Sequence, residues 1–291
     1  MTLLELVESL GARLEAAGVS YGHGTTCAFD EAAWLVLAKL GLPWETLEDT
    51  PGKLIEPCAA ADCEALVAQR IASRQPAAYL LGEAWLQGVA FHVDARTIVP
   101  RSFIAELIAD DTLLPWLPAE PTRVLDLCTG NGSLAVLAAL AWSDAQVDAC
   151  DLSAPALEVA ARNVERHGLG ARIALRRGDG LEAAAGPYGL ILCNPPYVPR
   201  ASMERLPPEY RAEPALALDG GADGMDFVRS LLAGLRAEPA RHLCPQGALV
   251  LEIGHERAHF EAAFPDLQPV WLPTSAGDDQ VLLLAREALA R

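Results

Sequence analysis

From residue 123 onward the sequence alternates between short aliphatic runs and longer helix-like segments, and this alternation restricts the chain to few folds. Predicted strands cover residues 123–128, 146–151, 172–177, 188–193 and 248–253. Predicted helices lie between them, over residues 133–142, 155–167 and 226–238. Residues 269–272 and 281–285, on either side of a Gly-Asp-Asp turn at 277–279, predict a closing pair of strands. Because strand–helix units repeat, we predict an α/β fold with a mainly parallel sheet that ends in an antiparallel hairpin.

Ahead of the first of these strands, the N-terminal part has helical periodicity. Predicted helices cover residues 3–17, 30–40 and 60–73. The period then changes to two, because Val89, Phe91 and Val93 alternate and a short run at 97–99 follows, which predicts a hairpin. We therefore predict a small all-α domain over residues 1–85, a β-hairpin linker over 86–100, and the α/β domain over 101–291.

The charge of the chain limits its partners. Its formal net charge is −17, its sequence pI is about 4.7, and its lysines are Lys39 and Lys53 alone. Proteins that bind nucleic acids usually carry clustered lysine and arginine to neutralise phosphates, and no such cluster is present. We expect no direct nucleic-acid binding. The acidic surface favours encounter with a basic protein.

Neither the apolar runs nor the cysteines indicate a membrane or an oxidising compartment. No apolar run approaches the ~18 residues that span a bilayer, and the N-terminus lacks the basic region of a signal peptide. The seven cysteines contain no Cys-x-x-Cys pair, and several fall in apolar runs where a reduced thiol packs as a small hydrophobe. We predict a cytoplasmic protein without membrane contact.

A glycine-containing turn follows the first strand of the α/β part and predicts a nucleoside site. The run from Asp126 to Gly132 includes Cys128, Thr129, Gly130 and Gly132, and glycines there let a ligand approach the backbone. The final glycine of the dinucleotide fingerprint is absent. We predict that Asp126 attracts a cationic cofactor, which favours S-adenosylmethionine over a nicotinamide.

Acidic residues that end the next two strands extend this site. Asp151 ends the second strand, where a carboxylate can accept hydrogen bonds from both hydroxyls of a ribose. Asp179 and Gly180 follow the third strand, and Asp179 is placed to meet the edge of an adenine ring. A plain strand–helix turn is the alternative reading of the loop alone.

The tetrapeptide Asn194-Pro195-Pro196-Tyr197 closes the fourth strand. An Asn side-chain oxygen and a Pro-fixed backbone carbonyl form a rigid pair of acceptors that suits a planar –NH₂ group. Punctuation between elements is the alternative, since Asn-Pro and Pro-Pro are common in turns. The long connection that follows, over residues 198–225, is rich in Pro and Gly, and we interpret it as a substrate-facing loop.

One further motif suggests a metal. His255-Glu256-Arg257-Ala258-His259 matches the His-Glu-x-x-His pattern of zinc hydrolases, which places two imidazoles on one helix face. No third ligand is apparent at a suitable position, and an ordinary strand–helix junction explains the segment. We therefore predict no metal, with a zinc hydrolase as the alternative.

Taken in order, the glycine loop, Asp151 and the Asn-Pro-Pro-Tyr motif resemble a class I (Rossmann-like) methyltransferase acting on an sp² –NH₂ nitrogen. Further matches run along almost the whole chain: Gly-His-Gly-Thr at 22–25, Val-Pro-Arg-Ser at 99–102, and the run from Leu206 to Pro214. Together they resemble the N(5)-glutamine protein methyltransferases, most closely the branch that modifies large-subunit ribosomal protein three. Cys128 suits that branch, and Phe103 departs from a common proline.

The resemblance implies an enzyme that transfers a methyl group from S-adenosylmethionine to the side-chain amide nitrogen of a glutamine in a protein. It implies catalytic roles for Asn194, Pro195 and Tyr197, with Pro196 beside them in the substrate site and Asn194 also near the cofactor. The all-α domain would then recognise the substrate. Two alternatives stay open: the glutamine of the Gly-Gly-Gln loop in release factors, and an adenine amino group in nucleic acid.

Overall fold

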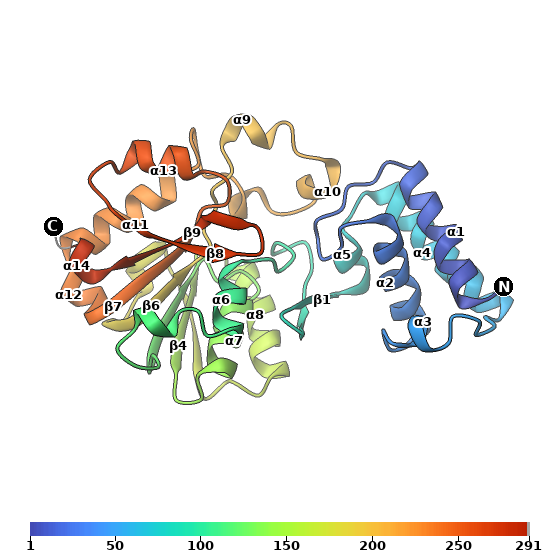
Figure 1. Cartoon of the computed structure of the whole chain (residues 1–291), viewed down its shortest axis with the longest axis horizontal. Coiled ribbons are helices and arrows are strands. Elements are labelled where there is room, and N and C mark those ends of the chain that lie inside the picture. Colours follow the sequence, from blue (N-terminus) through green and yellow to red (C-terminus); the bar gives the residue numbers. More distant parts are fainter. Residues whose placement is uncertain (290–291) are drawn as a thin grey trace.

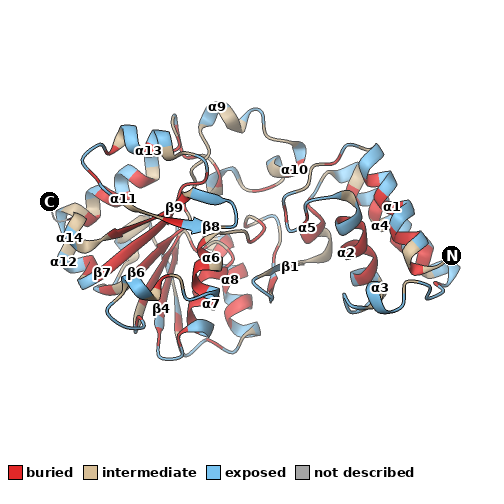
Figure 2. Ribbon diagram, viewed as in Figure 1, coloured by how far each residue is buried: buried red, intermediate tan, exposed pale blue. Residues whose placement is uncertain are grey.

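In the computed structural model, which describes residues 1–289, the N-terminal part of the chain consists of helices packed around a core of their own (Figure 1). These helices are α1 (Leu3–Ala16), α2 (Ala28–Leu40), α3 (Thr46–Asp49), α4 (Pro57–Ser73) and α5 (Ala77–Leu81). Helix α1 begins at a capping box in which Thr2 and Glu5 bond each other's backbone N–H. Its apolar residues recur at helical spacing, so one face is buried against α2 and α4 (Figure 2). The predicted helices at 3–17, 30–40 and 60–73 are confirmed.

The predicted hairpin is displaced toward the N-terminus. Strand β1 (Glu83–Leu86) pairs antiparallel with β2 (Val89–His92), and the turn is Gln87-Gly88, where both residues have positive φ. The prediction that the run at 97–99 belongs to the hairpin was therefore wrong, because residues 97–99 are not a strand. A two-residue turn of this kind matches the right-handed twist of the strands. It fixes which residues of β1 and β2 pair, which the alternation of apolar residues alone does not specify.

The rest of the chain is built on one seven-stranded sheet. Its strands are β3 (Arg123–Leu127), β4 (Gln146–Asp151), β5 (Ile173–Arg177), β6 (Tyr188–Cys193), β7 (Leu243–Glu252), β8 (Val270–Thr274) and β9 (Gly277–Ala285). The spatial order is β5-β4-β3-β6-β7-β9-β8, and β9 pairs antiparallel with both β7 and β8. The predicted mainly parallel sheet with a closing antiparallel hairpin is confirmed. The order reverses between β3 and β6, and ligands of such sheets bind at this reversal, beyond the carboxyl ends of the strands.

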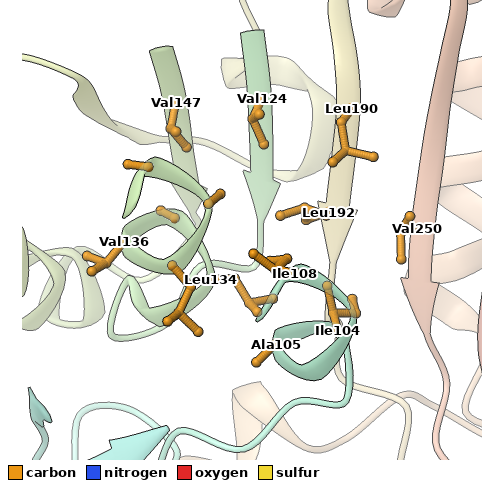
Figure 3. Packing of buried hydrophobic residues seen from close by; sticks show 14 of the residues in the cluster. Ile104, Ala105, Ile108, Val124, Leu134, Val136, Val147, Leu190, Leu192 and Val250 are labelled. Carbon is orange, nitrogen blue, oxygen red and sulfur yellow. The ribbon is translucent and has the colours of Figure 1, made fainter. Parts of the chain in front are cut away.

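Helices cover both faces of the sheet (Figure 1). One core cluster joins one face to α6 (Ile104–Ala109), α7 (Ser133–Ala141) and α8 (Ala154–Arg166). The other joins the opposite face to α11 (Asp226–Ala237), α13 (Arg257–Ala263) and α14 (Arg286–Leu289). Neighbouring residues of one strand serve opposite faces: Val124 belongs to the first cluster and Leu125 to the second. Figure 3 shows Val124, Val147, Leu190 and Val250 from four strands meeting Ile104 and Leu134.

Shorter elements complete the chain. They are η1 (Leu114–Trp116), η2 (Gly180–Ala183), α9 (Arg200–Met203), α10 (Pro208–Arg211), η3 (Ala215–Ala217) and α12 (Pro239–His242). Elements α9, α10 and η3 lie in the long connection after β6, which extends toward the N-terminal helices (Figure 1). Within residues 1–289 no helix combines the length and the apolar composition that a membrane crossing requires.

Candidate active site

The loop after β3 is held in place by the strand beside it. Cys128 and Gly130 both have left-handed backbone conformations, with φ of 58° and 56°, so the chain reverses sharply at the strand end. The Gly130 N–H donates to Asp151 Oδ2 at 2.9 Å, and the Ser153 N–H donates to Asp151 Oδ1 at 2.8 Å. Burial raises the pKa of the Asp151 carboxyl, and these backbone donors offset part of that rise. The carboxylate at the end of β4 thereby fixes the loop and keeps further acceptor positions free.

Asp126 is bonded within the loop itself. It is buried, and its Oδ2 accepts hydrogen bonds from the Thr129 hydroxyl and from the Ala135 N–H, the latter at 3.0 Å. Burial raises the pKa of Asp126 to about 7. Asp126, Thr129 and Gly132 do not line the cavity described next, so they shape the loop from behind. Gly132 is confined by packing, because a Cβ there would lie 3.2 Å from Ala160 Cβ on α8.

A cavity of about 800 Å³ lies beyond the carboxyl ends of β3, β4, β5 and β6. Seven residues predicted from the sequence line it: Cys128, Gly130, Asp151, Asp179, Gly180, Asn194 and Pro196. Sequence reasoning missed Phe227 at the start of α11, which also lines it and whose ring lies next to Gly180. It also missed Leu152, an exposed leucine directly after Asp151.

The lining of this first cavity fits a nucleoside cofactor. Asp151 offers carboxylate acceptors for vicinal hydroxyls, and Asp179 offers another beside the third strand. Leu152 and Phe227 supply apolar surface on which a flat base can pack. The tight backbone at Gly130 leaves room for close approach of the rest of the ligand.

A second cavity, of about 1,210 Å³, lies on the other side of the Asn-Pro-Pro-Tyr motif. Asn194, Pro195 and Tyr197 line it, together with Tyr210 from the long loop. It shares Asn194 with the first cavity, as well as two apolar residues, Ile98 and Ala217. Asn194 therefore stands where the two cavities meet, and a group in the second cavity can face a ligand in the first across this side chain.

The amide of Asn194 has a defined orientation. Its Nδ2 donates to the Arg101 carbonyl oxygen at 3.2 Å. Because a carbonyl oxygen only accepts, the nitrogen must face Arg101, and Oδ1 is the atom left for a ligand. Within residues 1–289 neither Asn194 Oδ1 nor the Pro195 carbonyl accepts a hydrogen bond. Two acceptors are thus available, one from Asn194 where the cavities meet and one from Pro195, which lines the second cavity.

Arg101 is itself held by Glu213 of the long loop. Its guanidinium makes two hydrogen bonds to the Glu213 carboxylate, both at 2.6 Å, and the Val99 N–H donates to the same carboxylate at 2.9 Å. His23 Nε2 lies 3.6 Å from Glu213 Oε2. Burial raises the pKa of Glu213, but the contacts from His23 and Arg101 outweigh it and bring the pKa down to about 2. The loop, the segment before α6 and the N-terminal part are thus tied together behind Asn194.

Tyr197 is packed against glycines. A Cβ at Gly254 would lie 2.6 Å from the Tyr197 ring, and a Cβ at Gly220 would lie 2.7 Å from the Tyr197 Cα. Burial and the neighbouring Glu252 carboxylate raise the pKa of Tyr197 above its ordinary value, so its hydroxyl stays protonated. Glu252 accepts hydrogen bonds from Ser102 Oγ at 2.6 Å and from the Phe103 N–H at 2.9 Å, which fixes the segment that carries Arg101.

The N-terminal helices grip the same loop at a second point. Glu209 of α10 forms ion pairs with two arginines at the end of α4. Its Oε1 lies 3.3 Å from Arg70 Nη1 and 2.8 Å from Arg74 Nε. The Tyr210 ring packs on the His23 ring in a tilted arrangement, with ring centroids 4.2 Å apart. The run from Leu206 to Pro214 therefore carries the loop's contacts to the helices, a role that its sequence does not reveal.

The histidine pair of the possible zinc motif does not share a helix. His255 precedes α13, whereas His259 lies inside it and contacts Glu256, with Nδ1 2.5 Å from Oε2. The pattern requires both imidazoles on one helix face, so the segment does not have the zincin geometry. Among residues 1–289 no three His, Cys, Asp or Glu side chains are grouped to hold a metal ion.

Comparison with known proteins agrees with this geometry. A family model described as the methyltransferase small domain matches residues 108–206. The ribosomal protein uL3 glutamine methyltransferase of Bordetella pertussis is 57% identical over 291 residues, which cover 99% of this chain and 96% of that protein. The protein of the same name from Burkholderia pseudomallei is 50% identical, with coverages of 97% and 94%.

Among solved structures, the hMettl16 catalytic domain in complex with MAT2A 3′UTR hairpin 6 superposes with a TM-score of 0.52 at 13% identity. The match covers 79% of this chain and 81% of that one, and it is a likeness of fold alone. The relatives confirm the predicted resemblance, and their methyltransferase name together with the family model implies the predicted methyl donor, S-adenosylmethionine. With 57% identity over nearly its whole length, the chain belongs to the family of ribosomal protein uL3 glutamine methyltransferases.

Proposed function

We propose that this protein methylates the side-chain amide nitrogen of one glutamine in ribosomal protein uL3. The observation that carries the proposal is the position of Asn194, whose free Oδ1 lies where the two cavities meet. One cavity suits a nucleoside cofactor, and the other is lined by Asn194, Pro195 and Tyr197, whose acceptors and ring suit a glutamine side chain.

Each residue of the first cavity would contact a different part of the cofactor. Asp151 would accept the ribose hydroxyls, Asp179 would meet the adenine edge, and Leu152 and Phe227 would pack on its faces. The loop at Gly130 would carry the methionine part past the backbone. When bound, S-adenosylmethionine supplies a methyl group activated by a positively charged sulfur.

The residues of the second cavity make the glutamine nitrogen reactive by orientation. An amide nitrogen is a poor nucleophile because its lone pair is delocalised into the carbonyl. Asn194 Oδ1 and the Pro195 carbonyl would each accept one of its N–H groups, which aims the nitrogen toward the first cavity. Tyr197, which is neutral and held in place by packing, would contact one side of the glutamine side chain. As the nitrogen takes the methyl group, the methyl–sulfur bond would break, S-adenosylhomocysteine would leave, and the nitrogen would release one proton to water. Catalysis is mainly orientation with electrostatic support.

The choice of uL3 rests on the relatives and on charge. The relatives named above carry the uL3 name, and the chain's net charge of −17 complements a basic ribosomal protein. The helical domain would recognise this substrate together with the long loop that it grips through Arg70, Arg74 and His23. We propose action in the cytoplasm, where ribosomal proteins are made, without membrane or direct nucleic-acid contact.

A side-by-side assay with labelled S-adenosylmethionine tests the proposal. Purified unmodified uL3, a release factor with its Gly-Gly-Gln loop, and an adenine-containing RNA are offered at equal concentrations. We expect transfer to one glutamine of uL3, located by mass spectrometry, with the release factor a poor substrate. Faster transfer to the release factor or to the RNA would overturn the assignment.

A further inference from the structure

Three tryptophans surround a hollow of about 480 Å³ on the N-terminal side of the molecule, and none of them lines the two cavities of the active site. Trp34 comes from α2, Trp44 from the segment between α2 and α3, and Trp85 from β1. Gly24 completes the wall, since a Cβ at this position would lie 3.4 Å from the Trp34 ring. We call this group of residues the aromatic hollow.

The aromatic hollow has a buried floor and an open rim. Trp34 is nearly buried, whereas Trp44 and Trp85 are 48% and 47% exposed. Trp85 follows the buried Ala84 on β1, and the pairing of β1 with β2 fixes its side chain on the outward face. Strand β1 lies between the helices and the large sheet (Figure 1). Clustered, exposed tryptophans are typical of binding sites, because large exposed apolar surface is otherwise avoided.

Acidic residues that follow Trp44 in the sequence favour a cationic occupant. Glu45 follows Trp44 directly, and Glu48 and Asp49 lie in the short helix after it. All three carboxylates are exposed, and none forms an ion pair within residues 1–289. Tryptophan faces attract lysine and arginine through the ring quadrupole, and neighbouring carboxylates strengthen that attraction. A purely apolar occupant would gain nothing from them.

A single loop connects the hollow to the active site. In the loop at residues 22–25, Gly24 lines the aromatic hollow while His23 faces Glu213 and packs against the Tyr210 ring. Tyr210 lines the second cavity. A protein bound with its glutamine in that cavity can therefore extend across this loop to reach the hollow.

We infer that the aromatic hollow receives a lysine or arginine side chain of the protein substrate, as a docking contact separate from the glutamine site. The inference rests on the proposed function, since the substrate is the basic protein whose glutamine is methylated. The hollow sets affinity for the whole substrate and takes no part in the methyl transfer.

The test compares the full-length wild type with the double variant Trp44→Ala/Trp85→Ala in methyl transfer to intact uL3. We expect the KM for uL3 to rise about tenfold while kcat is unchanged. A short peptide carrying the target glutamine reaches only the second cavity, so its KM should stay at the wild-type value. Trp116→Ala is the matched control, because Trp116 is 47% exposed but lies outside the hollow. Unchanged affinity for S-adenosylhomocysteine shows that the variants are folded.

Two further pairs of variants identify the occupant. Trp44→Phe/Trp85→Phe keeps an aromatic face and should recover most of the affinity, whereas Trp44→Leu/Trp85→Leu keeps apolar area alone and should not. Recovery with leucine, or a wild-type KM in the alanine variant, overturns the inference and leaves the proposed function intact. Conversion of a wild-type dimer to a monomer by the alanine pair would also overturn it, by assigning the hollow to a second copy. If the wild type does not methylate uL3, the proposed function falls and this inference falls with it.

Discussion

Replacing Glu213 with glutamine should loosen both the fold and the active site. The substitution keeps the shape of the side chain but removes the charge that receives Arg101 through two hydrogen bonds at 2.6 Å. The pKa of Glu213 lies at about 2 rather than 4.5, which corresponds to roughly 3 kcal/mol of stabilisation. Breaking a buried ion pair costs about 3–5 kcal/mol, and the partial exposure of Arg101 favours the lower end. We therefore expect Glu213→Gln to lower the free energy of unfolding by about 3 kcal/mol at pH 7.

The same substitution has a pH signature. The folded-state pKa of Glu213 is depressed, so its stabilisation is fully present above pH 4.5 and is lost as the pH falls toward 2. Urea unfolding at pH 7, 5 and 4 should show the difference between wild type and variant shrinking below pH 4.5. Turnover should also fall, by roughly 10–100-fold, because the Arg101 carbonyl orients Asn194.

A surface pair provides the control for this prediction. Glu261→Gln removes a half-exposed partner of Arg257 at 2.8 Å and should change stability by no more than about 0.5–1 kcal/mol. A Glu213→Gln protein as stable as this control at pH 7 would refute the reasoning. A stability difference that does not change with pH would refute the assigned pKa.

Three further predictions concern the cofactor, the packing of Tyr197 and the encounter with substrate. Asp151→Ala should weaken S-adenosylhomocysteine binding by roughly 10–100-fold, because charged hydrogen bonds are worth about 1.5–3 kcal/mol each; unchanged affinity by calorimetry would remove Asp151 from the ribose site. Gly254→Ala should destabilise the protein by about 1–3 kcal/mol and raise the KM for uL3, because its Cβ would lie 2.6 Å from the Tyr197 ring. Gly168→Ala has a similar positive φ and open space, and an equal effect there would show that backbone strain, not Tyr197, is responsible. Methyl transfer to uL3 should slow as salt is added, and a rate independent of ionic strength would argue against charge steering.

Much of the fold is predictable from local patterns in the sequence. Aliphatic runs indicate the strands around Val124 and Leu190, and helical periodicity indicates the helices between them. The parallel sheet is therefore predictable from short stretches of sequence. The hairpin was misplaced because Val89, Phe91 and Val93 alternate equally well with partners on either side. The turn at Gln87 and Gly88 settled which side was used.

The site was predictable only where its residues stand at strand ends. Asp151 and Asn194 end or follow parallel strands, so the topology alone brings them to one edge of the sheet. Asp126 looked equivalent, yet its side chain points back toward α7, a direction that spacing does not specify. Glu213 meets Arg101 across 112 residues of sequence, and that pairing depends on how the long loop folds.

The role of Asn194 is the central claim, and Asn194→Ala tests it most directly. The side chain lies at the junction of two cavities, with Oδ1 free and Nδ2 bonded to Arg101. We predict that the variant binds S-adenosylhomocysteine as the wild type does, while its kcat for uL3 falls by about 100-fold or more. The decisive measurement is single-turnover methyl transfer to uL3 by both proteins under saturating cofactor. A variant that keeps more than about a tenth of the wild-type rate would contradict the account.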